Sequence, residues 1–363
     1  MNVSEETQKL KTVLGDMHRL NGTKLGVWFG CELPDHFGDW KREYRLLHEG
    51  VALLDKNYRT YLRFTGPDRV RYLNAILTND IKGLKENHAN ASLFLNPQGH
   101  IQAEIETHAL PDKLFCVSHA MIRERLIPAM DKYIIMDDVT LEDRTADCMT
   151  LAVEGPNAAA VTSELTGIDL NAMGELESRE ISVDGMDCRL VRRTPGNFAS
   201  AEFLGHAKDA AALWDVLHEA AKKHSGGPTG YQALNSVRLE QGIPWFGCDF
   251  GEKQIPHEAG LQDSHISYTK GCYTGQEIVE RVRSRGQVNR VRVSLWFEAD
   301  EIPRAGAALI REGKDVGVVT RVGFSVARAA GIGMGYVRRE HANVGTILQS
   351  DAGRAKIVAT PLS

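Results

Sequence analysis

The sequence lacks several features that would assign it to a specialised class of protein. No stretch holds 18 consecutive apolar residues, so no segment is predicted to cross a membrane. Acidic residues outnumber basic ones, 48 against 43, and the formal net charge of −5 argues against general binding to nucleic acid. The N-terminal stretch has acidic side chains and no apolar core of the signal-peptide kind. We expect an amphipathic helix there, with one face formed by Leu10, Val13, Leu14 and Met17.

Cysteine is scarce and dispersed. The six cysteines form no CxxC pair, which disfavours a zinc ribbon or a self-contained cluster motif. His257, Glu258 and His265 lack the spacing of metal ligands relative to one another, so we expect loop or interface histidines and no metal site. Scattered thiols without a secretion signal fit a reducing compartment, and a cytoplasmic location is expected.

What is present is a mixture of strands and helices. Strands are predicted at 59–65, 101–108, 148–154, 187–194 and 199–204, and helices near 119–132, 207–224 and 229–241. The two kinds of element do not alternate strictly, which indicates an α+β fold. Short alternating strands after Arg290 indicate a small barrel or sandwich, and the glycines of 331–335 are interpreted as part of it and not as a dinucleotide fingerprint. The run Ser225–Pro228 is the strongest linker signal.

The most informative stretch runs from Lys270 to Gly286 and places Cys272 between two glycines, just before a predicted helix. Thr274 and Glu277 have the spacing of a capping box, which makes Thr274 the expected N-cap. Free N–H groups at a helix start and the positive charge of Lys270 both favour a thiolate, so Cys272 is predicted to be reactive. The alternative is that Cys272 is a small buried apolar side chain, as most cysteines are.

The letters K-G-C-Y-x-G-Q-E in this stretch resemble the signature of the YgfZ-type folate-binding proteins. They are present as Lys270, Gly271, Cys272, Tyr273, Gly275, Gln276 and Glu277. That family is related to the glycine-cleavage T-protein, an aminomethyltransferase, and supports iron–sulfur enzymes. Nearly the whole chain is similar to the T-protein superfamily, with landmarks such as GVALLD, LAVEGPNAAAV and IPHEAGL. The resemblance implies that Cys272 is the functional thiol, supported by Lys270, Gln276 and Glu277.

The resemblance also implies a three-lobed ring of two interleaved N-terminal α/β lobes and a C-terminal β-barrel, with folate in the central channel. The first lobe is expected to combine residues 1–58, 146–172 and 226–290. The second would combine residues 59–145 and 173–225 in a ferredoxin-like antiparallel sheet with helices. The barrel would cover residues 291–363.

Two residues are implied to contact tetrahydrofolate or a one-carbon derivative of it. Glu202 is similar to the family's pterin-facing glutamate, and Arg238 matches the arginine that holds the glutamate tail. Without the resemblance, Glu202 would be interpreted as a solvated strand carboxylate. Arg238 would be a helix-surface arginine paired with Glu240 or a neighbour.

The T-protein also needs an acidic residue near the folate, in a stretch resembling N-x-x-G-G-I-L-D-D. Residues 96–104 correspond to it, with Ala103 at the first aspartate position and Glu104 at the second. A methyl group cannot take up a proton, which counts against the simplest transfer mechanism. A shift of one position would bring Glu104 or Glu106 into use, but alternation along a strand would put Ala103 and Glu104 on opposite faces.

Three functions follow, in this order. The first is a tetrahydrofolate-binding accessory protein for the maturation or repair of iron–sulfur proteins, with those proteins or their assembly factors as partners. The second is a T-protein-like aminomethyltransferase or related one-carbon transferase. The third is a scaffold that has lost folate. A further set of basic residues is expected on a solvated face, or against an acidic partner or polyglutamate tail: Arg281, Arg283, Arg285, Arg290 and Arg292.

Overall fold

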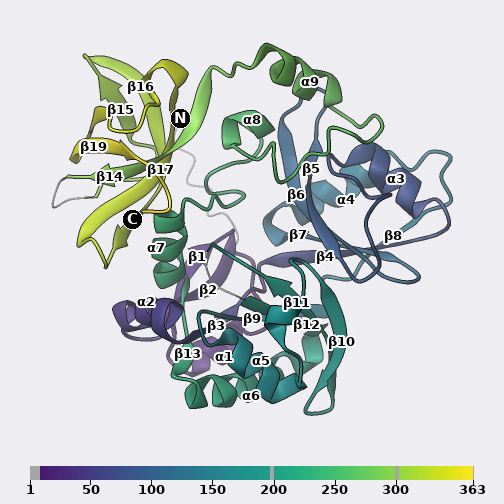
Figure 1. Cartoon of the computed structure of the whole chain (residues 1–363). Helices are drawn as coiled ribbons and strands as arrows, with labels where there is room; N and C mark the ends of the chain where they lie inside the picture. The colour runs from purple at the N-terminus through teal and green to yellow at the C-terminus, as the bar shows by residue number, and fades with distance from the viewer. Residues whose placement is uncertain (1–8, 197–199, 299–301, 363) are drawn as a thin grey trace. The chain divides into compact units, whose positions relative to one another are not determined.

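The structure is a computed structural model that describes residues 9–196, 200–298 and 302–362 (Figure 1). It confirms the α+β class and the C-terminal barrel. The chain divides into two compact units, and each is assembled from separated segments. Unit 1 contains the chain up to Arg63 with Val117–Asp131 and Leu141–Ala233. Unit 2 contains Phe64–Cys116, Lys132–Thr140 and the chain from Leu234 onward.

Unit 1 is built on a six-stranded sheet of order β10-β11-β12-β9-β3-β13. Its strands are β3 (Val51–Asp55), β9 (Cys148–Glu154), β10 (Ser178–Val183), β11 (Met186–Arg193), β12 (Ser200–His206) and β13 (Gly226–Pro228). Every residue of β3 is buried, and the apolar core of the unit includes Leu53, Leu151 and Phe203. The helices that contact this sheet are α2 (Trp40–Glu49), α5 (Ala158–Thr166) and α6 (Ala210–Lys223). Unit 1 also contains α1 (Gly15–Leu20), β1 (Lys24–Trp28), β2 (Cys31–His36), η2 (Leu170–Ala172) and η3 (Ala207–Asp209).

Two local predictions in unit 1 are wrong. The linker predicted at Ser225–Pro228 contains strand β13, which pairs in parallel with β3. Its glycines reflect close packing, because a Cβ on Gly226 would lie 2.3 Å from Val51 Cγ1. Part of the predicted N-terminal helix lies outside the described residues. In the described part, Leu10 forms a β-bridge with Cys31 and the helix begins at Gly15.

A five-stranded sheet of order β5-β6-β7-β4-β8 carries the boundaries between the units, which fall within β4, β7 and β8. Its strands are β4 (Arg59–Thr65), β5 (Ala89–Leu95), β6 (Ile101–Ala109), β7 (Leu114–His119) and β8 (Thr140–Asp143). The adjoining helices are α3 (Arg69–Ile76), η1 (Ala120–Ile122) and α4 (Arg123–Asp131). Strands β5 and β6 belong to unit 2 and pair antiparallel through the hairpin at 96–100.

The rest of unit 2 consists of short helices and a closed barrel of order β14-β17-β16-β15-β18-β19. The helices are α7 (Tyr231–Gln241), whose first three residues belong to unit 1, and α8 (Pro256–Ala259), α9 (Gln276–Arg285) and η4 (Arg339–His341). The barrel strands are β14 (Arg290–Phe297), β15 (Ala308–Arg311), β16 (Lys314–Ser325), β17 (Ala330–Arg338), β18 (Ile347–Ser350) and β19 (Gly353–Val358). The glycine run lies in β17, where a Cβ on Gly335 would be 2.5 Å from the Val318 carbonyl oxygen. These glycines therefore permit close strand packing, as predicted.

Candidate functional site

Cys272 lies on an exposed loop of unit 2, directly before α9. The interpretation of Cys272 as a buried apolar side chain is therefore wrong. The predicted N-cap is also wrong, because the cap residue is Gly275, with φ 82° and no side-chain cap hydrogen bond. Gln276 Oε1 instead accepts a hydrogen bond from the Tyr273 N–H at 3.3 Å, and Glu277 is exposed.

The loop around Cys272 is anchored on both sides of the thiol. Lys270 Nζ donates to the carbonyl oxygens of Asn74, Leu77 and Asn79, all at or just after the end of α3. After the thiol, the Tyr273 ring is buried at 6% exposure. Burial lowers the pKa of Lys270 to about 8, whereas its carbonyl acceptors favour the ammonium form. The exposed Cys272 thus lies between two anchored residues of the loop.

The start of α9 packs against the β5–β6 hairpin within unit 2. A Cβ on Gly275 would lie 2.6 Å from the Asn96 carbonyl oxygen, so the cap position has no room for a side chain. On the hairpin itself, a Cβ on Gly99 would lie 2.8 Å from Ile278 Cβ. The thiol loop and strand β6 are therefore parts of one packed body.

Strand β6 has one core face and one accessible face. Ile101, Ala103 and Ile105 are fully buried, whereas Glu104 and Glu106 between and beyond them are partly exposed. This confirms that Ala103 and Glu104 point to opposite faces. An aspartate at position 103 would place its carboxylate in the apolar core, so its absence there does not remove an accessible acid.

Glu104 forms a hydrogen-bonded chain with two neighbouring side chains. His265 Nε2 lies 3.1 Å from Glu104 Oε1, and His265 Nδ1 lies 2.7 Å from Ser264 Oγ. His265 is buried, and the Glu104 side chain is 30% exposed. A carboxylate oriented by an imidazole, with part of its surface open, has the geometry expected of a general acid or base. His265 lies in a loop, as the sequence indicates, and orients the Glu104 carboxylate from there.

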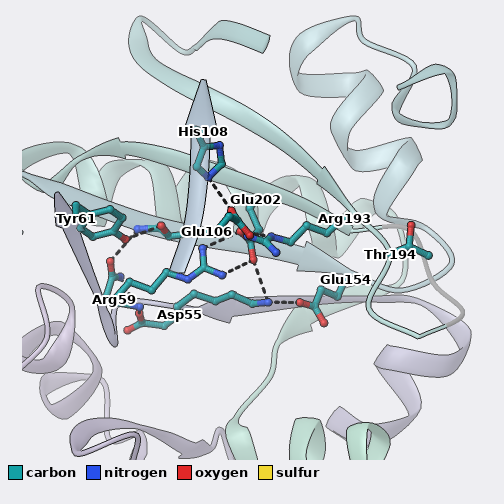
Figure 2. Close-up of polar contacts among 12 residues, drawn as sticks. Asp55, Arg59, Tyr61, Glu106, His108, Glu154, Arg193, Thr194 and Glu202 are labelled. Atoms are coloured by element: carbon teal, nitrogen blue, oxygen red, sulfur yellow. Dashed lines mark hydrogen bonds and ion pairs between the residues drawn. The ribbon is translucent and has the colours of Figure 1, made fainter. Parts of the chain in front are cut away.

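Glu202 is the centre of a buried charge cluster in unit 1 (Figure 2). Both Glu202 carboxylate oxygens accept from Arg59, at 2.7 Å each. Arg193 Nε lies 2.6 Å from Oε2, and Lys56 Nζ lies 3.3 Å from Oε1 and also pairs with Glu154. The interpretation of Glu202 as a solvated carboxylate is therefore wrong. Burial alone would raise the pKa of Glu202, but the surrounding cations hold it well below its usual value.

Arg238 is buried in unit 2 at 3% exposure. It pairs with Asp249, donates to Asn235 Oδ1 from Nε at 3.0 Å and from Nη2 at 2.8 Å, and stacks over the Trp245 ring. Burial lowers the pKa of Arg238. The interpretation of Arg238 as a surface arginine paired with Glu240 is wrong. Its internal partners occupy most of the donors that a glutamate tail would need.

The arginine series that follows Cys272 divides into two groups. Arg281, Arg283 and Arg285 are exposed on α9, as expected of a solvated face. By contrast, Arg290 pairs with Glu258 at 3.0 Å, and Arg292 donates to the carbonyl oxygens of Ala259 and Gly242. The solvated-face prediction is wrong for Arg292, which is bound to these carbonyl groups, whereas the Arg290 side chain is 38% exposed.

Sequence reasoning missed Lys56, Arg59 and Arg193 around Glu202. An available signal was Arg59 itself, a cation directly before the buried residues Thr60–Leu62 of the stretch RTYLRFT. Glu202 belongs to unit 1, whereas Arg238, Glu104 and Cys272 belong to unit 2. Within the described ranges, no cluster of histidine, cysteine and carboxylate side chains suits a metal ion, and no helix is long and apolar enough to cross a membrane.

Comparison with known proteins gives two family matches that together span most of the chain. The GCVT N-terminal domain matches residues 10–265, and the glycine cleavage T-protein C-terminal barrel domain matches residues 290–363. A protein named aminomethyltransferase from Rubrobacter xylanophilus is 27% identical over 330 residues, which cover 91% of this chain and 87% of the relative. Another of that name, from Desulfitobacterium hafniense, is 25% identical and covers 97% of each chain.

Among solved structures, the glycine cleavage system aminomethyltransferase T from Bartonella henselae is similar over 98% of both chains. Its TM-score is 0.88 at 22% sequence identity. At that identity the likeness shows a shared fold.

Proposed function

The chain belongs to the glycine cleavage T-protein family, and from this premise we propose that it transfers a one-carbon unit of the aminomethyl type to tetrahydrofolate. The observation that carries the proposal is the position of Glu104 on the accessible face of β6, held by His265 at 3.1 Å. The similarity of nearly the whole chain to proteins named aminomethyltransferase supports this function better than the iron–sulfur role.

The residues of this chain fit tetrahydrofolate unequally. Glu104 fits, because a partly exposed carboxylate can take a proton from, or return it to, a folate nitrogen. Glu202 fits less well, because its two carboxylate oxygens already accept from Arg59 and form ion pairs with Arg193 and Lys56. A pterin contact with Glu202 would require one of these cations to move.

In this proposal the chain contributes positioning and proton handling. Tetrahydrofolate, when bound, supplies the nitrogen that receives the carbon. The Glu104 carboxylate is the proton acceptor, and His265 keeps it in one orientation through a hydrogen bond at Nε2. Ser264 Oγ, 2.7 Å from His265 Nδ1, fixes the imidazole from its other side. His265 is thus a positioning residue, and Glu104 is the proposed acid–base group.

The test is the formation of methylenetetrahydrofolate from aminomethyl-lipoyl carrier protein, with release of ammonia and the reduced lipoyl arm, or from a methylamine donor supplied with an electron acceptor that removes two electrons. We expect turnover by the unchanged protein and a loss in kcat of at least about 100-fold in Glu104→Gln. Glu106→Gln is measured beside it, because Glu106 lies two residues further along the same face of β6 and is the other acid that the sequence offers; an equal loss would not single out Glu104. Calorimetry with tetrahydrofolate separates a lost reaction from lost binding. Intact folate binding without turnover would rule out the reaction for these donors.

We propose a second candidate function, an accessory role in the maturation or repair of iron–sulfur proteins. The exposure of Cys272 on an anchored loop favours it, together with the complete K-G-C-Y-x-G-Q-E motif. In this role the Cys272 thiol acts on a client protein or its assembly factor in the cytoplasm, and Glu104 is dispensable.

The test of this role is the activity of iron–sulfur enzymes in a strain that lacks the native gene. Cys272→Ala should fail to restore those activities, whereas Cys248→Ala should restore them, since Cys248 is only partly exposed and lies away from the motif. Normal activities with Cys272→Ala would remove the thiol from this function.

A further inference from the structure

Unit 1 contains a cavity of about 690 Å³ that is separate from the residues assigned above to one-carbon transfer. Its walls come from the segment before α1, the start of β4, the turn η1 and the start of β9. The lining includes Leu10, Val13, Arg59, Tyr61, Met121 and Cys148. A cavity of this size accommodates a small organic molecule.

Arg59 is a cation in the lining of this cavity, and hydrogen bonds to Glu202 orient its guanidinium group. Its Nη1 and Nη2 atoms each donate one hydrogen bond to Glu202, at 2.7 Å. A guanidinium has five N–H groups in a planar fork, so the Nε–H and one hydrogen on each Nη remain. Within the described part of the chain, Arg59 makes no other hydrogen bond. Its side edge therefore remains able to take a second carboxylate in the bidentate manner.

The charges behind Arg59 do not oppose an anion. Arg59, Arg193 and Lys56 all lie against the Glu202 carboxylate, and Lys56 also pairs with Glu154. The neighbouring carboxylate of Asp55 is engaged separately by His18, with Nε2 and Oδ2 3.0 Å apart.

The other charged side chains that line the cavity either cancel one another in charge or form an ion pair with a residue outside the lining. Lys11 and Glu124 carry opposite charges, and Arg123 is paired outside the wall with Asp143 at 2.6 Å. The thiol Cys148 is neutral near pH 7, because burial raises its pKa to about 11. The wall thus adds no net negative charge that would repel an anion.

Part of the cavity lining consists of exposed apolar side chains. Leu10 is 39% exposed, Val13 45% and Met121 41%, which places three of the chain's exposed large apolar side chains around one cavity. Scattered single apolar residues on a surface are common, but a group around a concave wall marks a binding site for apolar groups. The Arg59 cation and these three apolar side chains together favour a ligand that has both an anionic group and an apolar part.

We propose that this cavity binds a small molecule with a carboxylate and an apolar body, the carboxylate pairing with the side edge of Arg59 and the body resting on Leu10, Val13 and Met121. The site is independent of the proposed transfer to tetrahydrofolate, which uses residues of unit 2. Glu202 then serves as the group that orients Arg59.

Calorimetric titration with hexanoate, 3-phenylpropionate and 4-phenylbutyrate, each beside its primary amide, tests the proposal on the full chain. We expect the acids to bind at least about tenfold more tightly than the amides, since a charge-assisted bidentate pair is lost in the amide. Equal affinities, or no binding by any acid of the panel at millimolar concentration, would overturn the proposal.

Two variants locate the binding. Met121→Gln should weaken binding of 4-phenylbutyrate at least threefold, whereas Met136→Gln should not, because Met136 is 92% exposed and lies outside the cavity. Arg59→Lys keeps the charge and removes the fork, and it should bring acid and amide closer in affinity. If Arg59→Lys fails to fold, the pair of methionine variants still decides. The same affinity in both methionine variants would place the molecule elsewhere.

Discussion

Replacement of Glu202 by glutamine tests whether one buried carboxylate holds three cations together. Glutamine has nearly the size of glutamate, so the change removes charge without opening a cavity. In the unchanged protein, Glu202 is fully buried and lies within 3.3 Å of Lys56, Arg59 and Arg193. In the variant, these three cations lose the carboxylate that they share, and Lys56 keeps its pair with Glu154. We therefore expect a large loss of stability in unit 1.

The structure sets the size of that loss. Breaking a buried ion pair by removing one partner costs about 3–5 kcal/mol, because a charge is left without compensation. The matched control is Glu142→Gln, which removes a carboxylate paired with Arg63 where both side chains are about one-third exposed. An exposed pair contributes about 1 kcal/mol at most. Urea unfolding at pH 7, followed by tryptophan fluorescence from the buried Trp214 of unit 1, should show this difference.

The same variant predicts the pH dependence of stability. The pKa of Glu202 is well below its usual value in the folded protein, so the unfolded chain takes up this proton first as the pH falls. The stability contributed by the folded-state shift is present above the usual glutamate pKa of about 4.3 and declines below it. Glutamine does not titrate, so the gap between the two proteins should narrow on acidification. A loss at pH 7 no larger than that of Glu142→Gln, or a gap that widens in acid, would refute the reasoning.

Three further substitutions test the site in unit 2. Ala103→Asp should lower the free energy of unfolding by about 3 kcal/mol or more, because it buries an unpaired carboxylate. Its control, Gln102→Asp on the accessible face of β6, should change thermal stability little. Equal effects of the two substitutions would show that β6 has another register. Gly275→Ala should lower the free energy of unfolding by about 1–3 kcal/mol, because Gly275 has a positive φ and the new Cβ would lie 2.6 Å from a carbonyl oxygen. Its control, Gly271→Ala, has no atom within contact distance of the new Cβ and should not change thermal stability. Lys270→Met should leave three carbonyl oxygens without their donor and speed hydrogen exchange in residues 270–275. Its control, Lys82→Met at an exposed position, should leave that exchange unchanged. Unchanged exchange in Lys270→Met would mean that other contacts hold the loop in place.

The sequence predicted most of the elements of this fold. Local apolar patterns were sufficient for strands such as Arg59–Thr65 and Cys148–Glu154, which the structure has at the predicted bounds. They failed at Ser225–Pro228, where glycine signals a linker by composition but permits close strand packing in the fold. The difference depends on Val51, far away in sequence, and no local window contains it.

Long-range partners also explain what the sequence missed in the site. Thr274 and Glu277 have the spacing of a capping box, but contact with Asn96 of a distant hairpin makes Gly275 the cap. The pairing of Glu104 with His265 joins residues 161 positions apart, and that of Arg59 with Glu202 joins residues 143 apart. A single sequence shows that such charges exist and does not show which of them meet.

The position of Ala103 changes the weight of the two candidate functions. From the sequence, a methyl group at an expected aspartate position counts against one-carbon transfer, and Cys272 becomes the functional residue by default. In the structure that methyl group faces the core, and the accessible face of the same strand carries Glu104. Glu104 and Cys272 also belong to one packed body, because Gly99 of the β5–β6 hairpin lies against Ile278 of α9. A substitution that disturbs this packing would impair both functions alike. The isosteric Glu104→Gln and the small Cys272→Ala leave this packing intact, so these two variants separate the two functions in parallel assays.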